Sequence, residues 1–329
     1  MPKLVLILVS VSLIIPQSAS NNLPSYELSD SEEDGIYSTI VNNQRINESN
    51  LLFVLDRTSD SPRAEDLLEA YHQDSVATHL NEQDLTRFFN NTKGAFSLYD
   101  LKNNRYIRYN EARCRERFSP KSTFKIPNSL IGLETGVIRD ADFVIPWNRR
   151  KHPPQDNWNQ EPFNHWAQDQ TLRSAIKYSV VWYFQELALR VGEQRMKKYV
   201  TAFNYGNQNV SGGIDEFWLN GKLQISTDEE VEFLKAFYAE RLPISKRSIE
   251  IVKDILILEK TPAFTLSGKT GGGSVAEGKY IGWFVGYLET DGNVYFFATN
   301  IEGSNFPEIR EKRIDVTKQI LMHLGYLPK

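Results

Sequence analysis

Two groups of β-type segments lie far apart in this 329-residue chain, and the sequence between them is mainly helical. Asp291-Gly292, between the last two segments, is a strong hairpin signal. Both groups can join one sheet only if the two ends of the region meet in space. The sequence therefore predicts an α+β fold, with a central antiparallel sheet built from both ends and flanked by helices. The β-type segments are Gly94 to Tyr99, Arg105 to Tyr109, Phe264 to Thr270, Lys279 to Glu289 and Asn293 to Ile301.

Apolar residues at helical spacing predict the helices of the middle region and one at the end of the chain. These helices are Thr171 to Val191, Asp228 to Ala239, Ser248 to Leu258 and about Glu308 to Leu324. One or two peripheral helices are expected between Arg63 and Phe89.

Charge and composition argue against two classes of function. Lys and Arg total 38 against 42 for Asp and Glu, the net charge is −4, and no long basic run is present, so nucleic-acid binding is not expected. The five histidines show no metal-ligand spacing, so no metal site is expected. Cys114 is the single cysteine, which excludes an intramolecular disulfide.

The first residues have the pattern of a secretory signal. An apolar run from Leu4 to Ile15 ends at Pro16, before the small residues Ser18-Ala19-Ser20. The run is shorter than the roughly 20 apolar residues of a membrane span. We therefore expect an exported protein, periplasmic or secreted, with no membrane attachment after the signal is cleaved.

The chain is predicted to have three parts. Residues 1–20 form the signal, residues 21–78 an acidic leader, and residues 79–329 the catalytic domain. Between residue 21 and about residue 50 there are six acidic residues, one basic residue and few large apolar groups. Such a stretch cannot bury enough apolar surface to offset its ordering entropy, so the leader is expected to be partly disordered, with room for a peripheral helix.

The sharpest chemical signal is Ser122-Thr123-Phe124-Lys125. Residues three apart on a helix share one face, so the amine of Lys125 is expected within reach of the Ser122 hydroxyl. An amine that takes the proton of a hydroxyl activates it as a nucleophile. The pair therefore predicts a serine nucleophile with a lysine-derived base.

Spacing alone does not identify this pair, because Ser174-Ala175-Ile176-Lys177 has the same spacing. Pro120 precedes Ser122 and favours a helix start, where backbone N–H groups stabilise a developing negative charge. The second pair lies inside the predicted helix Thr171 to Val191, where a solvated surface is expected. We therefore assign the chemistry to the first pair.

Three further segments accompany it, namely Ser179-Val180-Val181, Tyr205-Gly206-Asn207 and Lys269-Thr270-Gly271. With these segments the sequence resembles the class D (oxacillinase-type) serine β-lactamases. The most specific stretches are STFKIPNSLIGLETGVI, YGNQNVSGGIDEFWLNGKLQIS and WFVGYLE. The resemblance spans about Gly94 to Tyr326.

The resemblance implies an exported serine hydrolase that opens the β-lactam ring of penicillin-type antibiotics. Ser122 would become acylated, and Lys125 would be the base in an N-carboxylated form, so that carbon dioxide is a covalent modifier and no other cofactor is needed. Burial that lowers a lysine pKa supplies the neutral amine for this modification. Trp218 is implied to donate its indole N–H to the carbamate, with Val181 and Leu219 as an apolar wall.

The family also implies roles for the residues around the nucleophile. Ser179 would relay a proton toward the leaving ring nitrogen. Lys269 and Thr270 would line the opposite side of the pocket, and Gly271 would let a substrate lie close against its strand.

Two further roles concern the negative charges of the reaction. The backbone N–H groups of Ser122 and Gly272 would hold the oxyanion. Arg313 would pair with the carboxylate of the drug, because a guanidinium fork suits a carboxylate. Arg310 is the nearby competitor for this role.

The sequence departs from the family at two places. Gly272-Gly273 follows the Lys-Thr-Gly segment where the family commonly has a bulky residue, so we expect a barer, more flexible pocket whose substrate preference is open. Asn148 to Asn164 is longer than its family counterpart and predicts an enlarged surface loop near the mouth of the site.

Two alternatives share the acylation chemistry. One is a penicillin-binding sensor whose acyl-enzyme does not turn over, and the other is a peptidoglycan transpeptidase or carboxypeptidase. Trp218 favours hydrolysis over both. The expected partner is a small-molecule β-lactam, and the protein is expected to be a monomer or homodimer.

Overall fold

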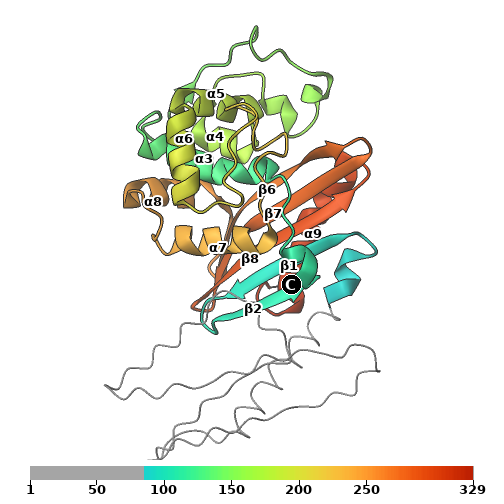
Figure 1. Cartoon of the computed structure of the whole chain (residues 1–329). Helices are drawn as coiled ribbons and strands as arrows, with labels where there is room; N and C mark the ends of the chain where they lie inside the picture. Colours follow the sequence, from blue (N-terminus) through green and yellow to red (C-terminus); the bar gives the residue numbers. More distant parts are fainter. Residues whose placement is uncertain (1–84, 329) are drawn as a thin grey trace, which may run out of the picture. The chain divides into compact units, whose positions relative to one another are not determined.

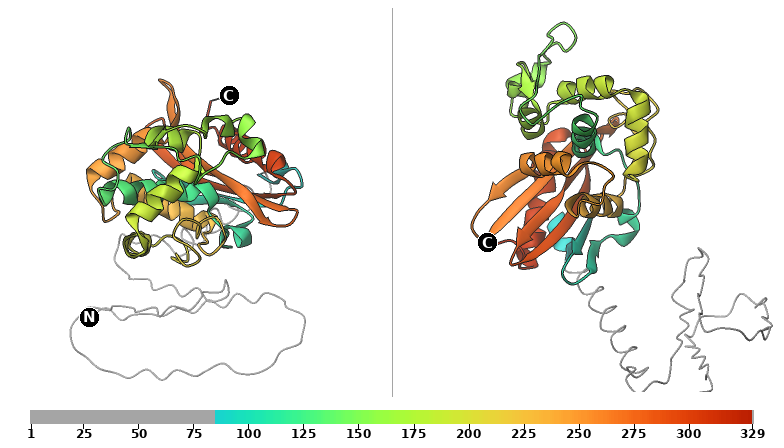
Figure 2. Two further views of the ribbon diagram at one scale, coloured as in Figure 1. Left: turned by 90° about the horizontal axis from the view of Figure 1, so that it is seen from above. Right: turned by 90° about the vertical axis from the view of Figure 1, so that its left-hand side faces the viewer.

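The computed structural model describes residues 85–328 (Figures 1 and 2). The predicted signal (1–20) and the predicted leader (21–78) lie outside the described residues. Residues 79–84 of the predicted catalytic domain also lie outside them. Residues 85–89 are helical.

Six strands form one antiparallel sheet in the order β2-β1-β8-β7-β6-β5. The first and last groups of strands meet where β1 pairs with β8, with Gly94 opposite Ile301 and Asp100 opposite Tyr295. The predicted α+β fold, with its sheet built from both ends of the domain, is therefore confirmed. The strands are β1 (Gly94–Asp100), β2 (Arg105–Tyr109), β5 (Ile257–Lys260), β6 (Phe264–Ala276), β7 (Lys279–Thr290) and β8 (Asn293–Gly303).

The central strands are buried on both faces because alternate side chains enter two separate apolar cores. In β7, Trp283 and Val285 belong to one core, whereas Phe284 and Leu288 belong to the other. This is the two-residue period of a strand that is covered on both sides.

The predicted hairpin between β7 and β8 is confirmed, because Thr290 pairs with Asn293. Asp291 and Gly292 both have positive φ, 50° and 68°, as the favoured two-residue hairpin turn requires.

Helices cover both faces of the sheet. The long helix α9 contacts β6, β7 and β8, and α7 contacts β1, β7 and β8. Helices α3, α4, α5, α6 and α8 pack on one another, and α4, α5 and α6 lie in the upper part of Figure 1. The α-helices are α2 (Glu111–Cys114), α3 (Lys125–Glu134), α4 (Leu172–Lys177), α5 (Val181–Val191), α6 (Glu193–Ala202), α7 (Thr227–Tyr238), α8 (Lys246–Ile255) and α9 (Phe306–His323).

Short elements complete the middle region. They are the 3-10 helices η1 (Lys121–Phe124), η2 (Asp156–Asn159) and η3 (Phe163–His165), and a two-stranded sheet of β3 (Val144–Ile145) and β4 (Gln170–Thr171). Within residues 85–328, no helix combines the length and the hydropathy that crossing a bilayer requires.

Two predicted helices are wrong in extent. The predicted helix Thr171 to Val191 is two helices, α4 and α5, because Ser179 between them has a left-handed φ of 54° that no helix accommodates. The predicted helix Ser248 to Leu258 ends at Ile255, and the chain then pairs with β6 as β5. In both cases tertiary structure overrides the helical spacing of the apolar residues.

Candidate active site

The nucleophile turn lies where η1 continues into α3. Ser122 is in η1, Lys125 is the first residue of α3, and both side chains are buried. The Nζ atom of Lys125 lies 2.7 Å from Ser122 Oγ. The helical offset of three residues therefore gives the contact that the sequence predicts.

Ser179 joins this pair to a second lysine. Lys125 Nζ donates to the Ser179 carbonyl oxygen at 2.9 Å and lies 3.1 Å from Ser179 Oγ. Lys269 Nζ, from β6, lies 3.0 Å from the same Oγ. The left-handed turn between α4 and α5 thus places one hydroxyl between two buried amines.

Burial sets the charge state of both amines. It lowers the pKa of Lys125 well below its ordinary value, and the nearby Lys269 lowers it further. Burial, followed by the charge of Arg313, lowers the pKa of Lys269 to about 7. A lowered pKa favours the uncharged amine, and an uncharged Lys125 amine can accept the proton of the Ser122 hydroxyl.

Strand β6 presents a free edge beside the nucleophile. Its pairing with β5 ends at Ser267, so Lys269, Thr270 and the glycines after them have no partner strand on that side among residues 85–328. Instead, η1 packs against β6 there. Backbone groups on an unpaired edge are available to a ligand.

Two glycines of this edge are required by close packing, which the sequence did not indicate. A Cβ atom on Gly271 would lie 2.7 Å from the carbonyl oxygen of Pro120, and one on Gly272 would collide with Arg313 Nη1. Gly271 therefore permits the close approach of η1 to β6, and Gly272 leaves room for the arginine.

Arg313 faces the site from α9. It is buried, and its Nη1 donates to the Gly271 carbonyl oxygen at 2.5 Å, while its Nε has no hydrogen-bond partner among the described residues. Arg310, the competitor, is only half-buried.

Trp218 lies against the nucleophile turn. Its ring is 1% exposed and stacks on Phe124, with centroids 5.4 Å apart. Within the described part of the chain its indole N–H has no acceptor, whereas the indoles of Trp166, Trp182 and Trp283 donate to backbone carbonyl oxygens. A donor is therefore left available in this wall of the site.

The two apolar residues predicted beside Trp218 are half-buried. Val181 begins α5, Leu219 follows Trp218, and both pack against the core that contains Phe124.

The site gathers four buried basic side chains. Lys121, Lys125, Lys269 and Arg313 are each no more than 7% exposed, and no carboxylate of the described residues pairs with them. Buried charges are normally paired, so this arrangement is suited to receive anionic groups.

The sequence analysis missed a buried carboxyl behind the nucleophile turn. Glu230 of α7 is fully buried, and its Oε1 accepts hydrogen bonds from Thr123 Oγ1 at 2.6 Å and Tyr205 Oη at 2.9 Å. Its Oε2 has no partner among the described residues. The helical spacing of Glu230, Leu234 and Phe237 is a signal that Glu230 faces inward.

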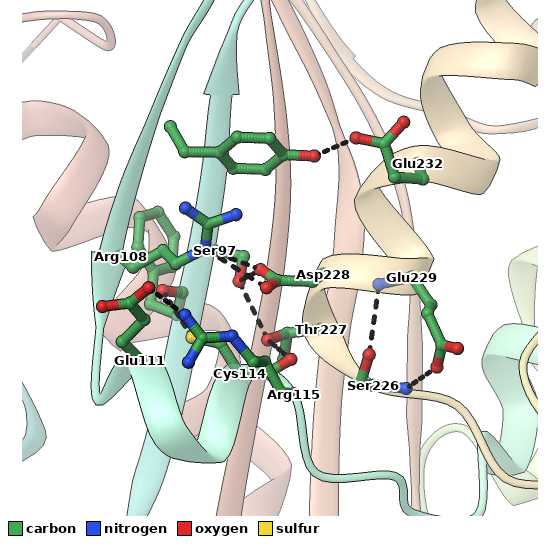
Figure 3. Close-up of polar contacts among 12 residues, drawn as sticks. Ser97, Arg108, Glu111, Cys114, Arg115, Ser226, Thr227, Asp228, Glu229 and Glu232 are labelled. Carbon is green, nitrogen blue, oxygen red and sulfur yellow. Dashed lines mark hydrogen bonds and ion pairs between the residues drawn. The ribbon is translucent and has the colours of Figure 1, made fainter. Parts of the chain in front are cut away.

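Figure 3 shows how the first turn of α7 is held. Ser226 and Glu229 form a capping box, with Glu229 N–H donating to Ser226 Oγ and Ser226 N–H donating to the Glu229 carboxylate. Asp228 accepts hydrogen bonds from Arg108 of β2 at 2.9 Å and from Ser97 of β1 at 2.7 Å. These contacts fix the first turn of α7 against the sheet, and so orient the Glu230 side chain toward the interior.

Replacing Glu230 with Gln is expected to remove a pH-dependent cost of folding. Burial raises the pKa of Glu230 from 4.5 to about 7, so its contribution to stability is present below about pH 4.5 and lost as the pH rises through 7. Tyr205, Thr123 and Glu229 are the groups that face it. Relative to the native chain, the free energy of unfolding of Glu230→Gln should rise by about 2.5 kcal/mol between pH 5 and pH 8.

Urea unfolding of both proteins at the two pH values measures this difference. A stability difference that is the same at pH 5 and pH 8 would show that Glu230 does not titrate as its burial requires.

Two sequence signals lie away from the chemistry. Asn207 of the Tyr205-Gly206-Asn207 segment uses its amide on Lys222 and Gln224 backbone groups, so it supports a loop and does not line the site. In the second Ser-x-x-Lys pair, Ser174 completes a capping box at the start of α4 and Lys177 is exposed.

The predicted loop Asn148 to Asn164 contains η2 and leads through η3 toward the site. Trp166, just after η3, donates its indole N–H to the Tyr178 carbonyl oxygen at 2.9 Å, directly before Ser179. The loop is thereby anchored next to Ser179. Within the described range, no group of three or more His, Cys, Asp or Glu is arranged to hold a metal ion.

Comparisons with known proteins agree with this geometry. Residues 86–324 match the family model of the penicillin binding protein transpeptidase domain. The probable β-lactamase YbxI of Bacillus subtilis (strain 168) is 38% identical over 251 residues, which cover 76% of this chain and 88% of YbxI. The crystal structure of the class D β-lactamase YbXI from Nostoc has 42% identity and a TM-score of 0.68, over 74% of this chain and 99% of that one.

A relative of another kind is also similar. The regulatory protein BlaR1 of Bacillus licheniformis is 37% identical over 228 residues, which cover 69% of this chain and 36% of BlaR1. The buried serine–lysine pair, the sheet topology and the matches over most of the described residues all support the same protein family. This chain belongs to the class D β-lactamase family of serine β-lactam hydrolases.

Proposed function

We propose that the protein hydrolyses penicillin-type β-lactams through an acyl-enzyme on Ser122. The observation that carries the proposal is the 2.7 Å contact between Ser122 Oγ and the buried amine of Lys125. In the acylation step Lys125 takes the hydroxyl proton while Oγ attacks the β-lactam carbonyl carbon, and the ring C–N bond then breaks. Ser179, between both amines, passes a proton to the ring nitrogen.

Other residues hold the charges that the reaction creates. The backbone N–H groups of Ser122 and Gly272 stabilise the oxyanion, since Ser122 lies in the first turn of η1 and Gly272 on the free edge of β6. Lys269, Thr270 and Arg313 bind the carboxylate of the substrate, which fits the unpaired positive charge of the site.

We propose that Lys125 acts as the base in an N-carboxylated form, made by carbon dioxide, and that this form also serves deacylation. The modification joins the amine nitrogen to the carbon of carbon dioxide with release of a proton, and it supplies a carbamate oxygen that activates water. The residues present suit it. The amine is desolvated, Trp218 has a free N–H donor, and Val181 and Leu219 provide apolar cover.

Export is part of the same proposal. The segment 1–20 directs the chain out of the cytoplasm, and the mature protein begins after Ser20. The mass of the protein recovered from the periplasm or the culture medium tests this, because retention of residues 1–20 would contradict it.

Similarity to BlaR1 favours one second candidate, a sensor that is acylated and does not turn over. The two functions separate when the protein is mixed with a chromogenic cephalosporin in bicarbonate buffer. Continuous turnover supports the hydrolase. A single stoichiometric burst supports the sensor, and it would equally fit a transpeptidase or carboxypeptidase that binds the drug as an inhibitor.

Replacing Trp218 with Phe tests the lysine modification. The variant keeps the stacking on Phe124 and removes one donor to a charged group, a loss of about 1.5–3 kcal/mol. We expect kcat at low bicarbonate to fall by about 10- to 100-fold and to recover when bicarbonate is added. Trp158→Phe is the matched control, because that indole N–H is also unpaired in the described structure but lies in η2.

Steady-state kinetics over a series of bicarbonate concentrations tests whether the Trp218 indole supports the proposed carbamate. A Trp218→Phe variant with the same bicarbonate response as Trp158→Phe would argue against the proposed role of the indole.

A further inference from the structure

Lys121, directly before the nucleophile, is a buried cation that the mechanism above does not use. It is 6% exposed, and burial alone lowers its pKa, because no carboxylate of the described residues faces it. Its Nζ donates to the carbonyl oxygens of Leu219 at 2.6 Å and Ser274 at 2.7 Å. Taking an ammonium group out of water costs free energy, and hydrogen bonds to these two carbonyl oxygens offset part of that cost.

The two acceptors lie on different sides of the site. Leu219 follows Trp218, whose own carbonyl oxygen accepts the Lys121 backbone N–H at 3.2 Å. Ser274 lies on the free edge of β6, three residues beyond Gly271. No strand pairs with that edge in the described structure, so the ammonium takes the place of a strand partner there.

The backbone at Lys121 is adapted to this reach. Its φ is +53°, a left-handed conformation that non-glycine residues seldom adopt. Gly273 has a φ of +154°, and a Cβ atom placed on it would lie 3.9 Å from Cδ and Cε of Lys121. The stem of the lysine therefore runs beside the double glycine, where the sequence alone predicts a bare pocket.

We propose that Lys121 is a positioning residue that joins the two sides of the active-site mouth. It holds the Trp218-Leu219 segment and the edge of β6 at a fixed separation around Ser122. The kinetic consequence rests on the proposed function, since both the carbamate donor and the oxyanion donor lie on the segments that it joins. The structural connection itself does not depend on any activity.

Lys121→Met tests the connection, because it keeps an unbranched stem and removes all three donors. Hydrogen exchange of the full mature chain should become at least about tenfold faster in residues 216–220 and 272–276, with α9 and β1 unchanged. Lys222→Met is the matched control, since Lys222 is an exposed lysine of the same loop whose side chain makes no hydrogen bond to the described residues. It should leave exchange in both segments as it is.

Lys121→Arg completes the design, because a guanidinium retains donors for both carbonyl groups. It should restore slow exchange in both segments. With a chromogenic cephalosporin, Lys121→Met should lower kcat/KM by about tenfold and Lys121→Arg should recover most of it.

Three results would overturn the proposal. They are unchanged exchange in either segment of Lys121→Met, equal acceleration throughout the sheet, or a Lys121→Arg protein that exchanges as fast as Lys121→Met. If both segments exchange faster but no variant or native protein hydrolyses the cephalosporin, the connection stands and the proposed function fails.

Discussion

Ser122→Ala is expected to abolish turnover of a chromogenic cephalosporin, with a loss in kcat of about 10⁶-fold, because it removes the proposed nucleophile, whose hydroxyl lies 2.7 Å from the Lys125 amine. Ser174→Ala is the matched control, since Ser174 has the same spacing to a lysine but completes the capping box of α4. It should keep its kcat and lose only about 1 kcal/mol of stability.

Intact-protein mass spectrometry gives the second half of this prediction. The native chain should gain the mass of the opened drug for a short time, and Ser122→Ala should gain none. A covalent adduct on Ser122→Ala would place the nucleophile elsewhere.

Lys125→Ala is expected to lower kcat by about 10³- to 10⁴-fold, the contribution of a well-placed general base. Lys177→Ala, at the exposed lysine of the second pair, should have no effect on kcat. Unlike the Trp218 variant, Lys125→Ala should not recover with bicarbonate, because the amine itself is gone.

The pH dependence has a definite sign. Burial lowers the pKa of Lys125 well below its ordinary value, so the native enzyme loses the free amine, and activity, only as the pH falls through that lowered pKa. Added bicarbonate should shift this loss to lower pH. If Lys125→Ala kept more than about a tenth of the native kcat, the assignment of the base would be wrong.

Local spacing was sufficient for some of the structure. The contact between Ser122 and Lys125 follows from one helical turn, and the hairpin at Asp291-Gly292 follows from two residues that tolerate positive φ. The distribution of β-type segments along the chain gave the pairing of both ends in one sheet. Each of these depends on residues that are close in sequence or on a pattern of whole elements.

The remaining features depend on contacts between distant residues. β5 is a strand only because β6 pairs with it, and the helical spacing of its apolar residues concealed this. Ser179 adopts its left-handed conformation between α4 and α5, where it contacts Lys125 and Lys269, which are distant in sequence. The carboxyl of Glu230 and the ammonium of Lys121 belong to residue types that are usually exposed, so only the packed structure gives their positions.

The central claim is that the Lys125 amine, beside the nucleophile, carries a carbamate in the working enzyme. Carbon-13 NMR of the mature protein equilibrated with ¹³C-labelled bicarbonate tests it directly. The account predicts one protein-bound carbamate resonance that is absent from Lys125→Ala and present in Lys177→Ala. An enzyme that hydrolyses the cephalosporin at full rate while showing no such resonance would contradict it.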